Sequence, residues 1–368
     1  MRAAVMRHRE LVVDELPIPE PGPGEVLVKT LACGICGSDL HALRYGEELV
    51  ASSRRTDGVF DMDLDRDVVM GHEFCAEIVD HGPDTRATLG AGTAVCSLPV
   101  LLRPAGVQTL GYSNDHPGGY GEYMRLTESL LLPVPNGLAP AHAALTEPMA
   151  VGAHAVAMAR LDTDDVPLVI GCGPVGLAVI AGLKARAARP IIAADYSARR
   201  RELALTMGAD IVVDPAVDSP YTSWADAAAI TTPAAKPKPW AQGPATRPAV
   251  IFECVGVPGV IDQILERAPK RARIVVVGVC MQTDHFHPMY AINKELNIQF
   301  VLGYTRNEFA HTLHAIAEGV TNVAPLITAS VGIDGVAAAF DDLAAPDLHA
   351  KILVEPWRAA PGLAPPRP

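Results

Sequence analysis

The middle of the chain alternates short apolar runs with segments of helical period. The apolar runs span 168–170, 191–194, 211–213, 250–253 and 274–277, and the helical segments span 175–187, 198–207 and 260–267. Near-continuous apolar strands that alternate with helices are typical of a parallel sheet covered by helices on both faces. We therefore predict a doubly wound α/β domain over residues 151–295.

The flanking parts of the chain show a different pattern. Residues 1–35 contain short apolar runs separated by turn residues, above all the Pro- and Gly-rich stretch 17–24. Short strands punctuated in this way favour a partly open β-barrel. After residue 296 we expect the chain to return to this first domain, with helices at 308–318 and 336–343 and a strand at 351–354. The predicted domains are 1–150 with 296–368, and 151–295.

Four segments interrupt these patterns. The polar segment 44–67 predicts an enlarged surface loop, either a solvated insertion or a lid over the substrate. The stretch 214–248 predicts a surface excursion, since its many prolines exclude a long helix. The tail 359–368 has the composition of a disordered segment with nothing to pack against. Residues 140–159 predict two short helices joined at Pro148.

Composition narrows the class of protein. The 368 residues are 49% hydrophobic, enough for two cores, and 30 basic against 42 acidic residues give a net charge of −12. An acidic chain disfavours nucleic-acid and acidic-membrane partners. No run of membrane-spanning length is present, and the 7 cysteines fit reduced thiols better than a disulfide framework. We expect a cytoplasmic protein.

Three separated residues have the chemistry of one metal site. Cys36 offers a thiolate, His72 an imidazole and Glu147 a carboxylate. Three protein ligands with a fourth position left open are the arrangement of catalytic zinc. Cys33 also lies three residues before Cys36, but no second pair follows at the spacing of a zinc knuckle. We therefore interpret Cys33 as a packed thiol.

A second motif indicates a dinucleotide site. The apolar run that begins at Leu168 ends in Gly171-Cys172-Gly173-Pro174-Val175-Gly176 and opens a helical segment. The first glycine allows a tight turn, the second lets the backbone approach a pyrophosphate, and the third lets helix and strand pack closely. Asp195 ends the next apolar run, where the fingerprint places the acidic residue that binds the adenosine ribose.

These motifs occur in the order found in one known family. The sequence resembles the zinc-dependent medium-chain dehydrogenases/reductases in GICGSDLH (34–41), GHEFCAEIV (71–79), TEPMAVGAH (146–154), VIGCGPVGLAVI (169–180) and FECVG (252–256). The resemblance implies a GroES-like catalytic domain and a Rossmann dinucleotide-binding domain. Glu147, where liver-type alcohol dehydrogenases carry Cys, makes the chain more similar to the polyol, threonine and butanediol dehydrogenases.

The resemblance also implies roles for residues around the metal. Cys36, His72 and Glu147 would hold one zinc, which lowers the pKa of a bound alcohol. Ser38 would accept the alcohol proton and pass it through the cofactor ribose to His41, although Ser38 also suits a helix cap. Asp39 would accept from a ligand imidazole, by analogy that of His72. Glu73 would either displace water from zinc or remain a carboxylate beyond the ligands.

The same resemblance raises two questions about metal and coenzyme. Many relatives carry four closely spaced cysteines that hold a second, structural zinc, whereas this chain has only Cys96 in that region, so we expect a single zinc. Asp195 should favour NAD by repelling a 2′-phosphate. Arg199, Arg200 and Arg201 follow it, however, and an arginine at this point can serve NADP.

We expect reversible hydride transfer between a secondary alcohol or vicinal diol and NAD, in a homodimer or homotetramer. One alternative is an NADPH-dependent carbonyl reductase of the same superfamily. Another is a cofactor-binding protein that has lost activity. The zinc-free quinone and enoyl reductases of the superfamily lack the set of Cys36, His72 and Glu147.

Overall fold

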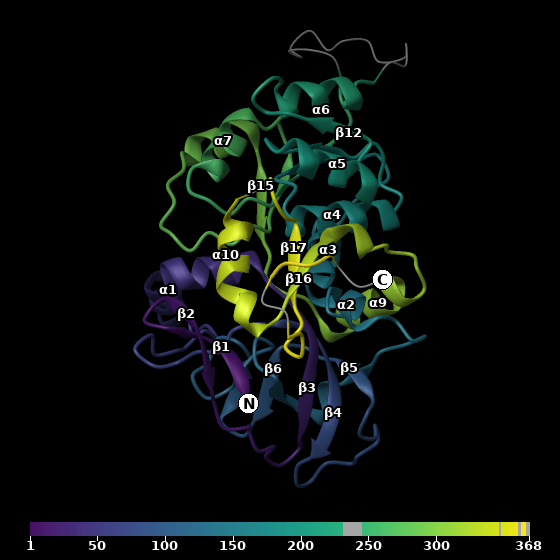
Figure 1. Cartoon of the computed structure of the whole chain (residues 1–368). Coiled ribbons are helices and arrows are strands. Elements are labelled where there is room, and N and C mark those ends of the chain that lie inside the picture. The colour runs from purple at the N-terminus through teal and green to yellow at the C-terminus, as the bar shows by residue number, and fades with distance from the viewer. Residues whose placement is uncertain (231–244, 346, 360–361, 366–368) are drawn as a thin grey trace. The chain divides into compact units, whose positions relative to one another are not determined.

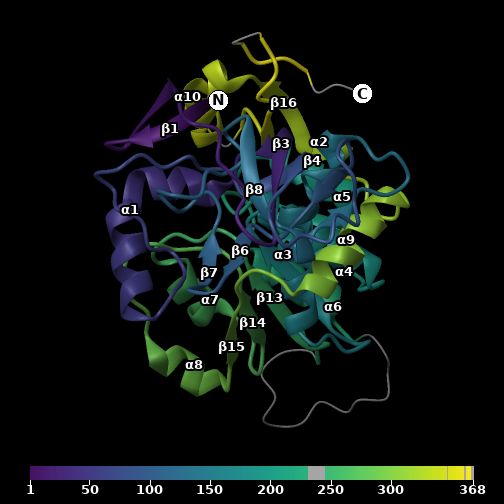
Figure 2. The same ribbon diagram turned by 90° about the horizontal axis from the view of Figure 1, so that it is seen from below.

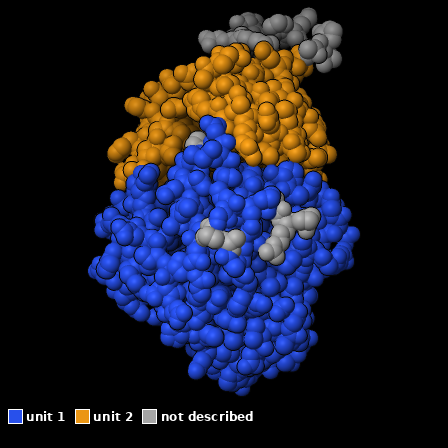
Figure 3. Space-filling model, in the orientation of Figure 1, with its two compact units in different colours: residues 1–148, 305–368 blue, residues 149–304 orange. Residues whose placement is uncertain are grey.

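The computed structural model describes residues 1–230, 245–345, 347–359 and 362–365. The chain divides into two compact units, which Figure 3 shows in separate colours. Unit 1 comprises Met1–Pro148 and Thr305–Pro368, and unit 2 comprises Met149–Tyr304. We describe each unit by itself.

Unit 1 is built on a seven-stranded sheet. Its order is β16-β17-β3-β4-β5-β9, and β8 pairs with β3. The strands are β3 (Glu25–Gly34), β4 (Glu73–His81), β5 (Ala94–Cys96), β8 (Tyr123–Thr127), β9 (Leu132–Pro133), β16 (Ile327–Val331) and β17 (Lys351–Val354). Two hairpins accompany the sheet, β1 (Arg2–Arg7) with β2 (Glu10–Glu15) and β6 (Val100–Arg103) with β7 (Gly106–Thr109).

The core of unit 1 follows from alternation along these strands. Val26 and Val28 of β3 are fully buried, as are Ala76 of β4 and Ile352 of β17. Alternate side chains of a strand point to the same face of the sheet, so apolar residues two apart build one buried layer. Helix α10 (Val336–Ala344) adds Phe340 to the same cluster. The predicted strand 351–354 and helix 336–343 therefore form where the pattern indicates.

Helix α1 (Gly37–Arg55) corrects the prediction of a loop over 44–67 for residues 44–55, whereas residues 56–67 form neither helix nor strand. Its backbone departs from helical geometry at Tyr45, and Figure 2 shows the two parts of the helix. Val50 is buried, and Leu40 and Leu43 pack against the core. Many exposed charges conceal this apolar stripe in the sequence, because surface helices carry polar residues over most of their circumference.

Two helices precede the dinucleotide motif. They are α2 (Pro140–Ala143) and α3 (Thr146–Met158), and the break falls at residues 144–145. Pro148 thus lies in the first turn of α3, which corrects the prediction that it joins the helices. A proline is tolerated there because the first backbone N–H groups of a helix have no partner within the helix. Glu147 lies in this same turn.

Unit 2 is a six-stranded parallel sheet with the order β12-β11-β10-β13-β14-β15. This order is that of a dinucleotide-binding fold. The strands, labelled in part in Figures 1 and 2, are β10 (Val166–Ile170), β11 (Ile192–Ala194), β12 (Ile211–Val213), β13 (Ala249–Glu253), β14 (Arg273–Val276) and β15 (Asn297–Phe300). Because β15 completes the sheet, unit 2 extends beyond the boundary at residue 295 expected from the sequence.

Helices cover this sheet on both faces. The helices of the unit are α4 (Pro174–Ala185), α5 (Ala198–Met207), α6 (Pro220–Ala228), α7 (Val260–Arg267) and α8 (Pro288–Lys294). Trp224 of α6 and Ile264 of α7 share one core cluster with Leu168 and Ile251 of the sheet. Helix α4 contacts β10 and β13 outside that cluster. The predicted doubly wound arrangement is confirmed.

Parts of two segments predicted to lie on the surface, the stretch 214–248 and the tail 359–368, contact the sheets. Trp224 is buried and donates a hydrogen bond to the Val166 carbonyl at 3.0 Å, so residues 220–228 belong to the core of unit 2. Residues 231–244 lie outside the described part of the chain. In the tail, Ala364 pairs with Ser330 of β16 through two backbone hydrogen bonds of 2.9 and 3.1 Å, which corrects the prediction that the tail has nothing to pack with.

One buried ion pair ties the last strand to the middle of the unit 1 sheet. Both carboxylate oxygens of Glu73, on β4, accept hydrogen bonds of 2.7 Å from the Lys351 ammonium, on β17. The ammonium also donates to the Ile35 carbonyl at 2.9 Å. Burial lowers the pKa of Lys351, but the charges of Glu73 and Cys36 outweigh that effect and raise it. The lysine therefore stays charged inside the protein.

We predict that Lys351→Met lowers the free energy of unfolding by about 3–5 kcal/mol, because Glu73 would become an uncompensated buried charge. Urea unfolding of the full chain measures this. The double variant Lys351→Met/Glu73→Leu should recover much of the loss, since both charges are then gone.

Lys29 provides the matched control for this measurement. Its ammonium lies 4.5 Å from the ring centroid of Trp357, at a half-buried site. Lys29→Met should cost only about 0.5–1 kcal/mol, the scale of an exposed cation–π contact. Equal losses for the two lysine variants would contradict a structural role for the buried ion pair.

Candidate metal and dinucleotide sites

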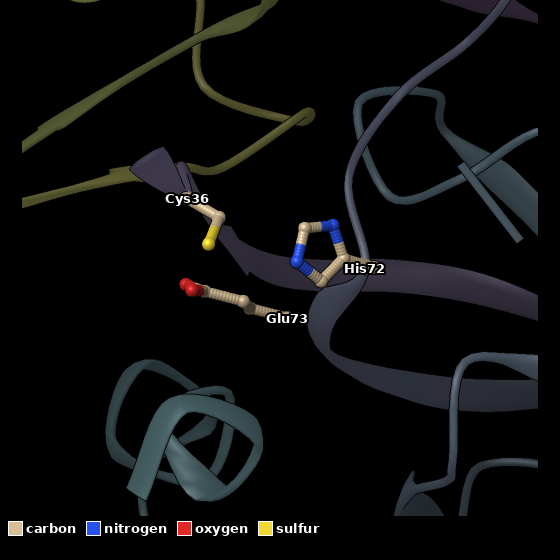
Figure 4. A group of neighbouring side chains, drawn as sticks. All are labelled: Cys36, His72 and Glu73. Carbon is tan, nitrogen blue, oxygen red and sulfur yellow. The ribbon is translucent and has the colours of Figure 1, made fainter. Parts of the chain in front are cut away.

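The candidate metal centre forms where β3 and β4 meet. Cys36 follows β3 and precedes α1, while His72 precedes Glu73 at the start of β4. One ligand atom from each of Cys36, His72 and Glu73 lies within 4.8 Å of the other two. Figure 4 shows the Cys36 sulfur and the Glu73 carboxylate turned toward one ring nitrogen of His72. The antiparallel register of Gly34 with Glu73 brings these residues together.

A glycine is required beside this centre. A Cβ atom at Gly34 would lie 2.0 Å from Glu73 Oε2, closer than any contact between non-bonded atoms allows. Glu73 is fully buried, so its carboxylate has no solvent-exposed position to move to. Gly34 therefore leaves the space in which the carboxylate reaches both Lys351 and the candidate metal position.

The residues present fit a zinc ion. A thiolate, an imidazole and a carboxylate are the ligands that zinc takes in catalytic sites. With Cys36 as a thiolate, this cluster and the nearby Glu147 carry more negative charge than Lys351 balances, and a divalent cation would neutralise the excess. A zinc at this position would be held by donor atoms and also offset buried charge.

Glu147 stands apart from the cluster that the structure brings together. It is buried in the first turn of α3, and its charge contributes to the raised pKa of Lys351. Among the described residues, the group with ligand atoms within 4.8 Å contains Glu73 and not Glu147. The carboxylate beside Cys36 and His72 is thus Glu73, and the assignment of Glu147 as third ligand remains a prediction.

Asp39 connects the metal cluster to its surroundings. Its Oδ2 accepts from the Cys36 backbone N–H at 3.0 Å and from the Tyr120 hydroxyl at 2.6 Å. Its Oδ1 lies 3.3 Å from His72 Nδ1. Burial raises the pKa of Asp39, but these neighbours outweigh it and hold the pKa below the ordinary value. Asp39 is therefore an ionised carboxylate.

His72 Nδ1 faces this carboxylate at an ion-pair distance, although their geometry is not that of a hydrogen bond in the described structure. Since Nδ1 faces Asp39, the ring nitrogen turned toward Cys36 and Glu73 in Figure 4 is Nε2. Burial lowers the pKa of His72, whereas the Asp39 charge raises it well above the ordinary value. A carboxylate on one ring nitrogen fixes the tautomer that offers the other nitrogen to a metal.

Ser38 and His41 lie in the first two turns of α1, three residues apart. Residues at this spacing share one face of a helix. Both are half-buried, and His41 packs edge-on against Tyr45 with ring centroids 6.3 Å apart. Ser38 Oγ is 2.9 Å from the Tyr112 hydroxyl oxygen. The structure thus places Ser38 beside a phenol that the sequence did not single out.

Three residues of the site were missed by sequence reasoning: Lys351, Tyr112 and Tyr120. The sequence contains one hint of the role of Lys351, because this charged residue opens the otherwise apolar run Lys351–Val354. The two tyrosines flank the glycine-rich turn at 118–119 and show no periodicity of their own. Their hydroxyl groups meet at Asp39, some seventy to eighty residues earlier in the chain.

A lone histidine in a turn is usually a solvated surface residue, but His116 is not. The side chain is buried, contacts Gln108 through Nε2 and accepts a 2.9 Å hydrogen bond from Arg125 at Nδ1. Burial and the charges of Arg103 and Arg125 lower the pKa of His116. Cys33 is fully buried and lies outside the metal group, as a packed thiol would.

The glycine-rich turn of unit 2 has the backbone that a pyrophosphate site needs. Gly171 follows β10 with a φ of 92°, in the region that favours glycine. A Cβ at Gly176 would lie 1.9 Å from the Gly171 carbonyl oxygen. Gly173 is the N-cap of helix α4, which begins with Pro174 and Val175. The helix N-terminus therefore forms the anion-binding end of the motif.

Asp195 is held firmly next to this turn. Its Oδ2 accepts from the Cys172 backbone N–H at 2.7 Å, and its Oδ1 accepts from the Ser197 N–H at 2.9 Å. Arg201 donates to the carbonyls of Asp195 and Tyr196 and pairs with Asp214 at 3.0 Å. Arg201 is thereby directed to neighbours within unit 2.

Arg200 is the remaining cation near the ribose position. Its Nη1 lies 4.0 Å from Asp195 Oδ2 and would be 3.9 Å from a Cβ at Gly173. Its buried Nε has no hydrogen-bond partner among the residues that the structure describes. Arg199 is exposed on the same helix. Asp195, which follows β11, and Arg200, which belongs to α5, thus lie side by side.

None of the helices in the described ranges is long and apolar enough to span a membrane.

Family models match both parts of the chain. Residues 22–136 match the alcohol dehydrogenase GroES-like domain. Residues 174–318 match the zinc-binding dehydrogenase model. The first match contains Cys36, His72 and Glu73. The second contains Asp195 and the last three residues of the glycine-rich turn, Pro174, Val175 and Gly176.

Individual relatives align over nearly the whole length. (R,R)-Butanediol dehydrogenase of Bacillus subtilis strain 168 is 30% identical over 368 residues, which cover 97% of this chain and 100% of the relative. Sorbitol dehydrogenase of Bos taurus is 27% identical over 344 residues, covering 90% and 89%. The crystal structure of 2R,3R-butanediol dehydrogenase from Bacillus subtilis superimposes with a TM-score of 0.78 at 29% identity, covering 96% and 99%.

The fold, the ligand chemistry at Cys36 and His72, and the family matches agree. The partly open barrel of unit 1 is a GroES-like domain, and the parallel sheet of unit 2 is a Rossmann domain. The chain belongs to the zinc-dependent medium-chain dehydrogenases/reductases and is an oxidoreductase acting on CH–OH groups.

Proposed function

We propose that this protein is an NAD-dependent zinc alcohol dehydrogenase that reversibly oxidises a secondary alcohol or vicinal diol to a ketone. The observation that carries the proposal is the cluster of Cys36, His72 and Glu73 with Ser38 at the start of the neighbouring helix. Relatives named for butanediol and sorbitol support a substrate with vicinal hydroxyl groups. Unit 1 would be the catalytic domain and unit 2 the dinucleotide-binding domain.

Cys36, His72 and Glu147 would hold the zinc, which supplies Lewis acidity to the alcohol oxygen. Asp39 keeps His72 in the tautomer that binds metal. Glu73 lies close enough to serve as an alternative ligand while Lys351 holds its carboxylate. Glu147 and Glu73 are thus two candidate carboxylates for the third ligand position of the zinc.

Ser38 would accept the alcohol proton and pass it through the cofactor ribose to His41, which would release it to solvent. Both residues are in α1, so the helix that begins at the metal ligand also carries the proton acceptors. A hydroxyl beside the metal can exchange protons without carrying a charge. An imidazole at the partly exposed next turn can then release the proton near neutral pH.

Asp195 would accept from the two hydroxyls of the adenosine ribose and so favour NAD. Its carboxylate is oriented by two backbone N–H groups, and a 2′-phosphate brought next to it would meet like charge. Arg200 is the residue that supports the alternative, an NADPH-dependent carbonyl reductase, because its guanidinium lies beside the same position.

We also propose a homodimer or homotetramer. Strand β15 is an edge of the described sheet of unit 2, and apolar side chains near it are exposed: Met289 by 60%, Ile292 by 67%, Phe300 by 60% and Leu302 by 74%. Exposed apolar surface beside a free strand edge suits pairing with a second copy. Light scattering distinguishes monomer, dimer and tetramer.

The free state of all 7 cysteines supports a reducing compartment, the cytoplasm.

The metal prediction concerns ligand identity. Purified protein should contain one zinc per chain by elemental analysis, and Cys36→Ala should remove both zinc and activity. Cys33→Ala is the control and should retain most of both, since that thiol packs outside the cluster.

Glu147→Gln and Glu73→Gln separate the two carboxylates. If Glu147 is the ligand, Glu147→Gln should lose zinc on dialysis while Glu73→Gln keeps it. The opposite result would make Glu73 the third ligand. Two tightly bound zincs per chain would contradict the single-site proposal.

The coenzyme prediction is a higher kcat/KM with NAD than with NADP. Asp195→Gly should narrow that preference by about 1–3 kcal/mol, the scale of a lost hydrogen bond to a charged group. Arg200→Ala is the matched variant, and it should weaken NADP more than NAD. A wild-type preference for NADP would overturn the assignment in favour of the reductase.

The reaction prediction is tested by following coenzyme absorbance across alcohols, vicinal diols, polyols and ketones. Turnover should be highest with a secondary alcohol or vicinal diol. Ser38→Ala should lower kcat by about a hundredfold or more, the scale of a lost proton acceptor. His41→Ala should slow turnover mainly at low pH, where hydroxide cannot replace it, and both variants should keep their zinc.

Two outcomes would count against this reaction. Full activity of Ser38→Ala at every pH would leave direct transfer of the proton to solvent. A protein that binds zinc and NAD but turns over no alcohol or ketone would support the remaining alternative, a cofactor-binding protein without activity.

A further inference from the structure

Tyr112 lies between the proposed proton acceptor and the carboxylate that orients the metal ligand. Its hydroxyl oxygen is 2.9 Å from Ser38 Oγ and 2.9 Å from Asp39 Oδ1. The side chain is buried, with its ring 5.3 Å from that of His72 and 5.2 Å from that of Phe60. The packing of the ring leaves the hydroxyl directed at these two partners.

The direction of each hydrogen bond follows from counting protons. A phenol carries one hydrogen, and the ionised Asp39 carboxylate can only accept. A phenol has an ordinary pKa of about 10, so it keeps its hydrogen at neutral pH. If that hydrogen pointed at Ser38, the lone pairs of two buried oxygens would face each other over 2.9 Å, which is costly. Tyr112 therefore donates to Asp39.

The hydrogen of Ser38 is then directed as well. With its own hydrogen donated to Asp39, the Tyr112 oxygen can only accept from Ser38. The lone pairs of Ser38 Oγ are left to face away from Tyr112, available to an incoming hydroxyl group. An acceptor oriented before the alcohol arrives can bind the alcohol hydroxyl without first turning. When Ser38 takes up the alcohol proton, its own hydrogen would turn from Tyr112 to the cofactor ribose, so that one proton enters the serine and one leaves.

We propose that Tyr112 is a positioning residue that holds the Ser38 hydroxyl in the acceptor orientation for the proton of the alcohol. The inference rests on the proposed function, because it assigns Ser38 the role of proton acceptor. It extends that function by adding a residue from the segment between β7 and β8, which carries no metal ligand.

Tyr120 provides the matched control. Its hydroxyl donates to the other oxygen of Asp39, at 2.6 Å, and to no atom of Ser38 in the described structure. Tyr112→Phe and Tyr120→Phe therefore each remove one hydrogen bond to Asp39, but only Tyr112→Phe removes the partner of Ser38. Any effect that passes through Asp39 and His72 should appear in both variants and should not depend on Ser38.

The test is a pair of double-mutant cycles on the full-length, zinc-loaded protein with NAD. Tyr112→Phe should lower kcat about tenfold, the effect of one hydrogen bond. In the Ser38→Ala background the same change should lower kcat less than about twofold, because the group that it positions is gone. Tyr120→Phe should have the same effect in both backgrounds. An equal loss from Tyr112→Phe in both backgrounds would overturn the inference.

A measurement without turnover separates this inference from the proposed function. The affinity for 2,2,2-trifluoroethanol, an alcohol that gives up hydride poorly, can be followed by fluorine NMR with NAD present. Tyr112→Phe should weaken binding about fivefold or more in the wild type and leave it unchanged in Ser38→Ala. This pattern without turnover of any alcohol would refute the proposed function and retain the positioning role. If the protein turns over alcohols but Tyr112→Phe and Ser38→Ala lower kcat by independent factors that multiply, the positioning role alone is refuted.

A third measurement does not require Tyr112→Phe to fold. With 3-fluorotyrosine incorporated at position 112, the fluorine resonance reports the hydrogen bond of the phenol. Ser38→Ala should shift this resonance, while His41→Ala should leave it in place. A resonance that does not respond to Ser38→Ala would show that the two hydroxyls do not interact, and would overturn the inference.

Discussion

The arrangement of the metal centre depends on the neutralisation of buried negative charge. Cys36, Glu73 and Glu147 bring acidic groups into one region, and Lys351 is the cation that the fold itself provides. A buried lysine is stable only while its partner is charged and well hydrogen-bonded. Because Lys351 comes from the last strand and Glu73 from the fourth, the central sheet of unit 1 cannot be complete until the C-terminal part of the chain has joined it.

A second constraint is the concentration of contacts on Asp39. One carboxylate accepts from the backbone at Cys36, from Tyr112 and from Tyr120, and faces His72. The short stretch 34–41 therefore contains Cys36, the proposed metal ligand, Ser38, the proposed proton acceptor, and Asp39, which faces His72. Since these residues lie in the first turns of one helix, their relative positions are set by helix geometry before the rest of the site is added.

Sequence reasoning succeeded where the signal is local and failed where contacts join distant segments. The parallel sheet of unit 2 was predictable because each strand is a continuous apolar run next to a helix of clear period. Helix α1 was missed beyond its first turn because its apolar stripe, Leu40, Leu43 and Val50, is narrow among many charges. Lys351 and Tyr112 carry no local pattern that reveals their partners, which lie in other strands and in α1.

The segment in which many zinc-dependent relatives carry four cysteines also contacts the candidate site. It lacks the cysteines of a second metal lobe and instead forms the β6–β7 hairpin, with Leu101 and Leu110 buried in the core. Thr109 donates to the Tyr112 carbonyl at 3.3 Å, which links the end of the hairpin to the phenol. The ring of Tyr112 packs against His72, and its hydroxyl contacts both Ser38 and Asp39. Because hairpin packing anchors the backbone of Tyr112, a change of sequence in this segment would reach the surroundings of Ser38 and of His72 together.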